Sequence, residues 1–274
     1  MKIQFLGTAA AEGWPAVFCA CEFCKKARSL GGKNVRTRQQ MLLDDNLLID
    51  LGPDTYMHAL VHGLEFSKVT GCLITHPHQD HYYPQELHMH HAPFAHGAQN
   101  LTLYGSMETL TQCKETLPDP ENIGISLQEV QVFRPFNTQD AHVIPLNALH
   151  ARNLQCMFYL IEKGGKTLLQ GYDTGWYPDE TWAALADYAK SGKKLDAVVM
   201  DCTNGPNPEA TNHCGLPDNV RIKAKLVEMG LSKPDTRWIV THFSHNGGLM
   251  HDEMVELAGQ DGFEVAYDGW CVAL

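Results

Sequence analysis

Short apolar runs recur along the chain and are separated by turn-forming residues. Runs rich in Val, Ile and Leu that are bounded by Gly, Pro, Asn or Asp are typical of strands. They predict strands in the segments 2–7, 46–52, 69–76, 101–105, 129–133, 142–150, 158–175, 195–203, 237–243 and 263–274. The pair Gly164 and Gly165 predicts a tight turn that makes the segment 158–175 a hairpin.

Segments with a helical spacing of apolar residues lie between these strands. They cover residues 22–30, 53–63, 84–96, 106–116, 178–191, 217–230 and 250–259. In residues 178–191, Trp182, Leu185 and Ala189 fall on one face, and Gly192 provides a stop. Strands and helices are mixed along the whole chain without a repeat or a linker. This pattern predicts a layered α/β architecture in a single domain of residues 1–274.

The composition is that of a globular protein with an acidic surface. Of the 274 residues, 44% are hydrophobic and 19% are charged, and the formal net charge is −11. An acidic surface repels nucleic acids and anionic membranes, and no basic run offsets it, so we expect neither as a partner. The first residues, MKIQFLGTAA, lack the apolar core of a signal peptide, and no stretch approaches the roughly 18 apolar residues of a membrane span. We therefore expect a cytoplasmic protein.

Potential metal ligands gather at the ends of the predicted strands. The chain has 15 histidines and nine cysteines, and thiols in a reducing compartment bind metals more often than they form disulfides. His76, His150, Asp173 and His242 each close an apolar run. One such residue is usually explained by local hydrogen bonds. Four of them, on rigid strands and facing the loops, indicate a preorganised site.

The densest group of candidate ligands is THPHQDH, residues 75–81. In an extended segment, residues two apart point the same way, so His76 and His78 can share one ion. The turn that follows directs Asp80 and His81 toward a second position, because six residues cannot wrap one ion with four ligands. Imidazole with some carboxylate suits Zn²⁺, and also Fe or Mn with open coordination sites. The alternative is a solvated, histidine-rich loop.

The motif H-x-H-x-D-H after an apolar strand resembles the signature of the metallo-β-lactamase superfamily. The resemblance extends over nearly the whole chain, through FLGTAA, LLIDLGPD with its Asp50, YDTG and THFSH in the expected order. It implies a four-layer αββα sandwich around two metal ions. By position, it assigns the ligands as follows: His76, His78 and His150 to one ion, Asp80, His81 and His242 to the other, and Asp173 to both.

Three cysteines lie within the six residues CACEFC, as Cys19, Cys21 and Cys24. Three close thiolates suit a structural Zn²⁺, which needs a fourth ligand for tetrahedral coordination. Because Cys-x-Cys is tighter than the usual zinc-knuckle spacing, buried free thiols remain an alternative from the spacing alone. Further cysteines in apolar segments are interpreted as core residues: Cys72, Cys113, Cys156 and Cys271.

The cysteine group, together with the late THxxH, is similar to a narrower family. Its members are phosphodiesterases that act on phosphoribosyl 1,2-cyclic phosphate in phosphonate breakdown by the carbon–phosphorus lyase pathway. This resemblance implies that His242 serves the catalytic metals, while His245 completes a structural zinc site with the loop 19–24. It also implies that His213, in a turn-rich loop, assists at the substrate phosphate. A homodimer is implied by this resemblance alone.

These residues predict a dinuclear metal-dependent phosphodiesterase, with Zn, Mn or Fe in the catalytic pair and one structural Zn. The substrate would be a small phosphodiester, linear or cyclic. A hydroxide shared by the two ions would attack phosphorus, Asp80 would orient it, and His213 would protonate the leaving alkoxide. The competing hypotheses are a tRNA 3′-processing endonuclease, a thioester or lactam hydrolase, and a non-hydrolytic accessory protein of the kind found in pyrroloquinoline quinone assembly.

Other histidines near the candidate ligands are left outside the predicted site. His142 competes with His150, but it begins its strand instead of ending it. A second group follows the dense cluster and is interpreted as a solvated helix face from which two or three side chains could reach the substrate: His88, His90, His91 and His96.

Overall fold

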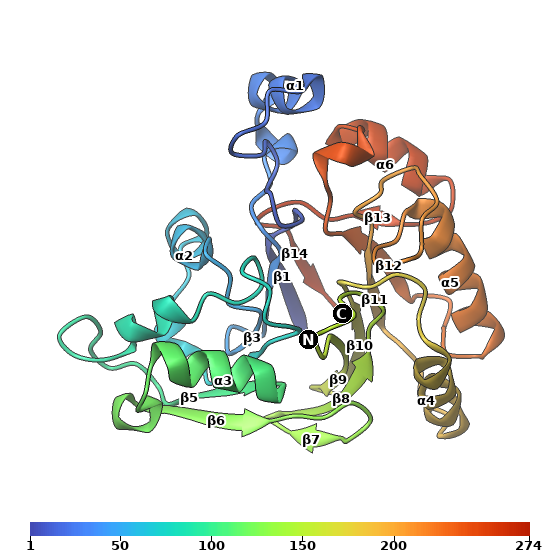
Figure 1. Ribbon diagram of the computed structural model, residues 1–274. Coiled ribbons are helices and arrows are strands. Elements are labelled where there is room, and N and C mark those ends of the chain that lie inside the picture. The colour runs from blue at the N-terminus through green and yellow to red at the C-terminus, as the bar shows by residue number, and fades with distance from the viewer.

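Two mixed β-sheets of seven strands each face one another, and helices cover their outer sides (Figure 1). The computed structural model describes all residues from 1 to 274. The first sheet is built from the N-terminal half of the chain plus the last strand, and the second sheet from the C-terminal half. The predicted four-layer αββα sandwich is confirmed.

Each sheet combines parallel and antiparallel strand pairs. Across the first sheet the strands lie in the order β14 (Cys271–Ala273), β1 (Lys2–Gly7), β2 (Gln40–Leu43), β3 (Leu47–Ile49), β4 (Gly71–Leu73), β5 (Leu101–Gly105) and β6 (Ile125–Glu129). Across the second they lie in the order β13 (Glu264–Val265), β12 (Arg237–Thr241), β11 (Ala197–Asp201), β10 (Lys166–Gly171), β9 (Met157–Lys163), β8 (Ala141–Asn147) and β7 (Phe136–Asn137). Strands β3 to β6 pair in parallel, as do β10 to β13, and the other pairs are antiparallel.

Six α-helices connect the strands. They are α1 (Glu22–Leu30), α2 (Thr55–His62), α3 (Met107–Thr116), α4 (Asp179–Lys190), α5 (Leu216–Glu228) and α6 (His251–Gly259). In Figure 1, α2 and α3 lie on the side of the first sheet, α4, α5 and α6 lie on the side of the second, and α1 projects beyond one end of the sandwich. None of the helices is both long and apolar enough to cross a membrane.

Buried side chains of the central strands alternate between two cores. In β9, Phe158 and Leu160 pack toward α4, α5 and α6, whereas Tyr159 and Ile161 pack between the two sheets. Strands that are buried on both faces are apolar at nearly every position, not at every second one. This is why unbroken apolar runs in the sequence predict these strands.

The direction of the strands brings the candidate ligands to one edge of the sandwich. Asp50 and His76 follow the parallel strands β3 and β4, and Asp173 and His242 follow β10 and β12. The carboxyl ends of parallel strands lie on the same edge of a sheet, which is where ligands bind in open α/β folds. Strands β8 and β10 both run antiparallel to β9, so they point in the same direction. The end of β8 therefore places His150 at this edge as well.

Three predicted elements differ from the structure, and strand β2 was not predicted. The strand predicted over 263–274 is two short strands in different sheets, β13 in the second and β14 in the first. The strand predicted over 129–133 is wrong: β6 covers Ile125–Glu129, and the chain then leaves the first sheet, with the amide of Phe133 donating to the carbonyl of Pro145 in the second. The strand β6 has mostly exposed residues at a sheet edge, so its sequence has no apolar run. The helix predicted over 84–96 is a 3₁₀ helix, Pro84–His90, that ends before Pro93.

The cysteines outside the CACEFC group are mostly core residues. Cys72, Cys113 and Cys156 are buried, as predicted. The prediction is wrong for Cys271, which is exposed because it lies on β14 at the edge of the first sheet.

The core between the sheets should dominate the stability of the sandwich. We expect Ile161→Ala to lower the free energy of unfolding by about 2–5 kcal/mol, because it leaves a cavity at a fully buried position. Denaturant unfolding of the metal-loaded protein measures this change. Val227→Ala on α5, where the side chain is exposed, is the matched control. A loss below about 1 kcal/mol for Ile161→Ala would contradict the assignment of this core.

Candidate metal centre

Three histidines form the first group of candidate ligands. His76 and His78 lie in the turn after β4, and His150 lies in the turn after β8. Nδ1 of His78 is 2.8 Å from Nε2 of His76 and 3.1 Å from Nε2 of His150. Two nitrogen ligands of a tetrahedral zinc ion are separated by about 3.3 Å, given Zn–N bonds of about 2.0 Å. The three nitrogens therefore converge closely enough to bind one ion.

The second group contains Asp80, His81, Asp173 and His242, and all four side chains are buried. Nε2 of His81 lies 3.1 Å from Oδ2 of Asp80 and 3.1 Å from Oδ2 of Asp173. Nε2 of His242 lies 2.8 Å from Oδ1 of Asp173. Two imidazoles and two carboxylates thus offer four ligand atoms to a second ion.

Asp173 stands between the two groups. Its Oδ2 lies 4.0 Å from Nε2 of His76 and 3.8 Å from Nε2 of His150, both in the first group. The same oxygen is 3.1 Å from His81 in the second group. A carboxylate in this position can be shared by two neighbouring ions.

Two buried residues behind the ligands orient their rings. Oδ2 of Asp50 lies 2.7 Å from Nδ1 of His81, and Oδ1 of Asp50 accepts hydrogen bonds from the amide and hydroxyl of Thr75. The hydroxyl of Thr75 in turn lies 3.0 Å from Nδ1 of His76. Asp50 has a φ of 66°, a left-handed conformation that costs a non-glycine residue on the order of 1 kcal/mol. These contacts leave Nε2 of both rings directed at the metal positions.

A second carboxylate, Asp201, holds His213 beside the two groups. Oδ2 of Asp201 lies 2.7 Å from Nδ1 of His213, and Oδ1 accepts hydrogen bonds from the amide and hydroxyl of Thr203. The Thr203 hydroxyl is also 2.8 Å from Nδ1 of His242. Burial alone would lower the pKa of His213, but Asp201 outweighs this and raises the pKa to about 9. Cations in the neighbouring site would lower it again.

The ligand groups have the features of a site that needs cations. Nε2 of His81, Nε2 of His242 and Oδ1 of Asp173 are buried without a hydrogen-bond partner. Burial alone would lower the pKa of His81, but Asp173, Asp80 and Asp50 outweigh it and raise that pKa well above its usual value. Divalent ions would satisfy both the orphaned atoms and the excess of negative charge, so the residues fit a metal pair.

A cavity of about 300 Å³ opens over the ligands. His78, His150 and His213 line it, together with Asp80, Asp173 and His242. The remaining wall comes from two segments far apart in the sequence, residues 10–12 and residues 244–246, and from Thr203. No Lys or Arg lines the cavity, so an anion there would be bound by the metal ions and by His213.

The histidines left outside the predicted site also lie outside this cavity. His142 is half-buried at the start of β8 and pairs with Asn137. His90 and His96 line a separate, mostly apolar cavity below α2, and His88 and His91 line neither. The structure therefore gives none of them a contact with the two ligand groups.

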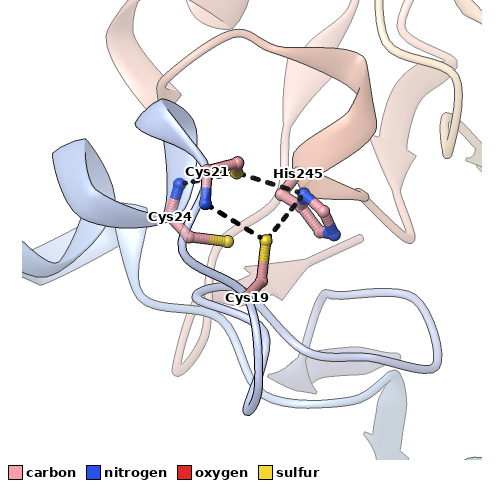
Figure 2. A group of neighbouring side chains, drawn as sticks. All are labelled: Cys19, Cys21, Cys24 and His245. Atoms are coloured by element: carbon pink, nitrogen blue, oxygen red, sulfur yellow. Dashed lines mark hydrogen bonds between the residues drawn. The ribbon is translucent and has the colours of Figure 1, made fainter.

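The three cysteines and His245 form a separate group (Figure 2). Sγ of Cys21 lies 3.5 Å from Nδ1 of His245, and Sγ of Cys19 lies 3.9 Å from the same atom. Zn–S bonds of about 2.3 Å and Zn–N bonds of about 2.0 Å place sulfur and nitrogen about 3.6 Å apart in a tetrahedral site. The distances fit a structural zinc ion, with His245 as the fourth ligand that the cysteine spacing requires.

The pKa values of these thiols differ. The amide of Cys24 donates a hydrogen bond to Sγ of Cys21, which is the main reason that the pKa of Cys21 is lowered to about 6. Burial raises the pKa of Cys24 to about 11. Cys21 is therefore already a thiolate at neutral pH, the form that binds zinc, and Cys24 needs the metal to lose its proton.

A family model described as a beta-lactamase superfamily domain matches residues 45–243. The chain belongs to this superfamily. The matched residues include both ligand groups, from His76 to His242, but not the CACEFC segment or His245. A search of curated proteins found no match.

Solved structures share the superfamily fold with this chain over its whole length. A diphosphatase from the PhnP family is 22% identical, with a TM-score of 0.72 over 100% of this chain and 97% of the other. Zn²⁺-bound PqqB from Methylobacterium extorquens is 17% identical, with a TM-score of 0.71 over 100% of both chains. The short form of human tRNase Z is 16% identical, with a TM-score of 0.66 over 100% of this chain and 99% of the other.

Three contributors to the site of this superfamily member were not singled out from the sequence. Asp201 closes the apolar run of β11, so the rule that found Asp173 and His242 could also have found it. Thr75 and Thr203 act through hydroxyl contacts to ligand histidines. Threonine is too common beside strands for such contacts to be visible in a sequence.

We expect the purified superfamily member to contain about three metal ions per chain, two in the paired site and one zinc on the cysteines. Replacing Cys21 with Ala should remove one zinc, because three ligands hold structural zinc poorly. Elemental analysis measures both counts, and Cys271→Ser, at an exposed thiol, should change nothing. A zinc content that is equal in Cys21→Ala and in the original protein would contradict the structural site.

Asp50→Asn should weaken metal binding without removing a ligand. Because Asp50 orients His81, we expect the affinity of the paired site to fall about 10–100-fold. Competition with a fluorescent chelator measures the affinity. The cysteine-bound zinc of the same variant is the internal control. An unchanged affinity of the paired site would show that His81 does not need this partner.

Proposed function

We propose that the chain is a dinuclear metal-dependent phosphodiesterase that acts on a small phosphodiester, linear or cyclic. One observation carries this proposal: His213, held by Asp201, faces a cavity whose base is formed by ligands for two ions. A proton donor beside a metal pair suits the hydrolysis of a phosphodiester, because the metals can activate the attacking water while the donor protonates the leaving group.

The metals would supply Lewis acidity and a water of lowered pKa. The residues of the chain do the rest. Asp201 binds Nδ1 of His213, so the proton available for the substrate lies on Nε2, facing the cavity. From there it can be given to the oxygen of the leaving alcohol. Asp80, which also lines the cavity, can orient the attacking water as well as bind metal.

The size and charge of the site favour a small substrate. A cavity of about 300 Å³ is at the lower end of the range for small-molecule sites. The net charge of −11 opposes binding of tRNA, although human tRNase Z shares the fold. A diphosphatase from the PhnP family shares it as well, which makes a small diphosphate diester a reasonable second substrate class.

Activity with bis(p-nitrophenyl) phosphate, in the presence of Mn²⁺ or Zn²⁺, tests the proposal. Hydrolysis that is abolished by Asp173→Asn supports it. A screen of thioesters and lactams tests the other hydrolases of the fold, and filter binding of tRNA at low salt tests the endonuclease. No turnover of any substrate would favour an accessory role, for which the fold shared with PqqB is the precedent.

The variant His213→Ala should show whether His213 acts as a proton donor or as a metal ligand. We expect turnover of a dialkyl phosphodiester to fall at least about tenfold, because its alkoxide leaving group is no longer protonated, whereas p-nitrophenolate leaves without a proton. Metal content should stay the same. His142→Ala, at a half-buried histidine outside the cavity, is the control. Loss of metal together with activity would instead identify His213 as a ligand, and unchanged turnover would refute its role as the acid.

We also propose a homodimer that forms through an exposed apolar surface on α2 and the segment 83–97. Six large apolar side chains there have exposed fractions between 45% and 66%: Tyr56, Met57, Leu60, Val61, Met89 and Phe94. Helix α2 has no charged residue, although the chain has a net charge of −11. Two copies can therefore meet at this surface without bringing their acidic charges together.

Leu60→Glu should convert the dimer to a monomer, because two copies of the new carboxylate would be buried against each other. Light scattering coupled to gel filtration measures the mass. Val255→Glu on α6, at a similarly exposed apolar residue outside this surface, is the control. A monomeric unaltered protein at micromolar concentration would refute the dimer.

A further inference from the structure

One short loop serves both metal groups. In THFSH, His242 belongs to the paired site and His245 to the cysteine group, and Ser244 lies between them. Residues 8–10 hold this loop in place, because the amide of Ala10 donates to the carbonyl of Phe243 and the amide of Phe243 donates to the carbonyl of Thr8. The chain then leads directly to Glu12.

Glu12 contacts the loop on the side that faces away from the thiols. Its Oε1 accepts a hydrogen bond of 2.5 Å from the Ser244 hydroxyl and lies 3.7 Å from Nε2 of His245. The other ring nitrogen of His245, Nδ1, faces Cys19 and Cys21. At 3.7 Å the carboxylate makes no hydrogen bond to the ring, but its negative charge favours a metal-bound imidazole and makes it a better ligand.

The same carboxylate reaches the candidate substrate cavity. Glu12 lines that cavity together with Ser244 and Asn246, and its side chain is 32% exposed. Its second oxygen, Oε2, makes no hydrogen bond within the chain. A carboxylate can only accept hydrogen bonds, so it favours a hydroxyl or amino group and repels a further negative charge.

We propose that Glu12 is a specificity-determining residue that is positioned by the structural zinc site. It would accept a hydrogen bond from a sugar hydroxyl of the substrate and disfavour doubly charged phosphomonoesters. His245 and Ser244 would hold the carboxylate in place. The selectivity part of this inference rests on the proposed phosphodiesterase function, whereas the link between Glu12 and the zinc site does not.

The first arm of the test measures zinc retention. Glu12→Gln keeps the size of the side chain but removes the charge next to His245, and we expect zinc to be lost to a chromogenic chelator about 10–100-fold faster. Glu22→Gln is the matched control, because Glu22 is exposed, lies next to Cys21 and has the same charge. Equal rates of zinc loss from Glu12→Gln and the original protein would overturn the link.

The second arm compares two diesters that differ only in their hydroxyls, uridine 5′-(p-nitrophenyl phosphate) and its 2′,3′-dideoxy analogue. For Glu12→Gln, we expect KM to rise about tenfold for the uridine ester, because a neutral amide oxygen replaces the charged acceptor of the hydrogen bond. KM for the dideoxy ester and kcat for both should stay within about twofold. Turnover of p-nitrophenyl phosphate, a phosphomonoester, should rise at least about threefold as the repulsion is removed.

The outcomes separate the two proposals. If the original protein hydrolyses neither diester, the phosphodiesterase proposal fails, and the zinc-retention arm still tests the link to Glu12. If it hydrolyses both and Glu12→Gln leaves the ratio of their KM values unchanged, the selectivity role of Glu12 is refuted. A parallel loss of kcat for both diesters would likewise refute it, because that result indicates damage to the metal pair.

Discussion

The position of Asp173 between two groups of ligands is the constraint on which the site depends. Its two oxygens must reach His242 and His81 on one side and approach His76 and His150 on the other. These residues come from strands of both sheets. Only a sandwich in which both sheets present their carboxyl ends at the same edge can bring them together, and the packed core between the sheets fixes the spacing.

The cost of this arrangement is a concentration of buried acidic groups. Asp50, Asp80, Asp173 and Asp201 are all at most 5% exposed, and no Lys or Arg lines the cavity. Carboxylates in such surroundings are strongly disfavoured unless they are paired with cations or hydrogen-bond donors. Threonine hydroxyls and backbone amides satisfy Asp50 and Asp201. Asp80 and Asp173 have no such donors, so metal ions would have to balance their negative charge. Metal binding and the stability of the folded site are then coupled.

Much of this centre was predictable because its ligands are placed by strand ends. The apolar runs before His76, His150, Asp173 and His242 locate four candidate ligands in the sequence, and the density of THPHQDH adds three more. The sequence pattern does not reveal residues whose roles depend on contacts that form only in the folded chain. The roles of Thr203 and Glu12 come from contacts between segments far apart in the chain, and Thr75 acts through a hydroxyl contact to its neighbour His76. Strand β6 was missed for another reason: only Ile125 and Leu127, on one face of this edge strand, pack against the core, and the other positions are polar.

The separation of only three positions between His242 and His245 has an evolutionary consequence. His242 has a φ of 61°, and the loop that follows it turns at once into the short helix His245–Gly247. Inserting or deleting even one residue here would rotate one imidazole away from its partners and so disable one of the two centres. We therefore infer that this loop keeps a fixed length in homologues that retain both centres.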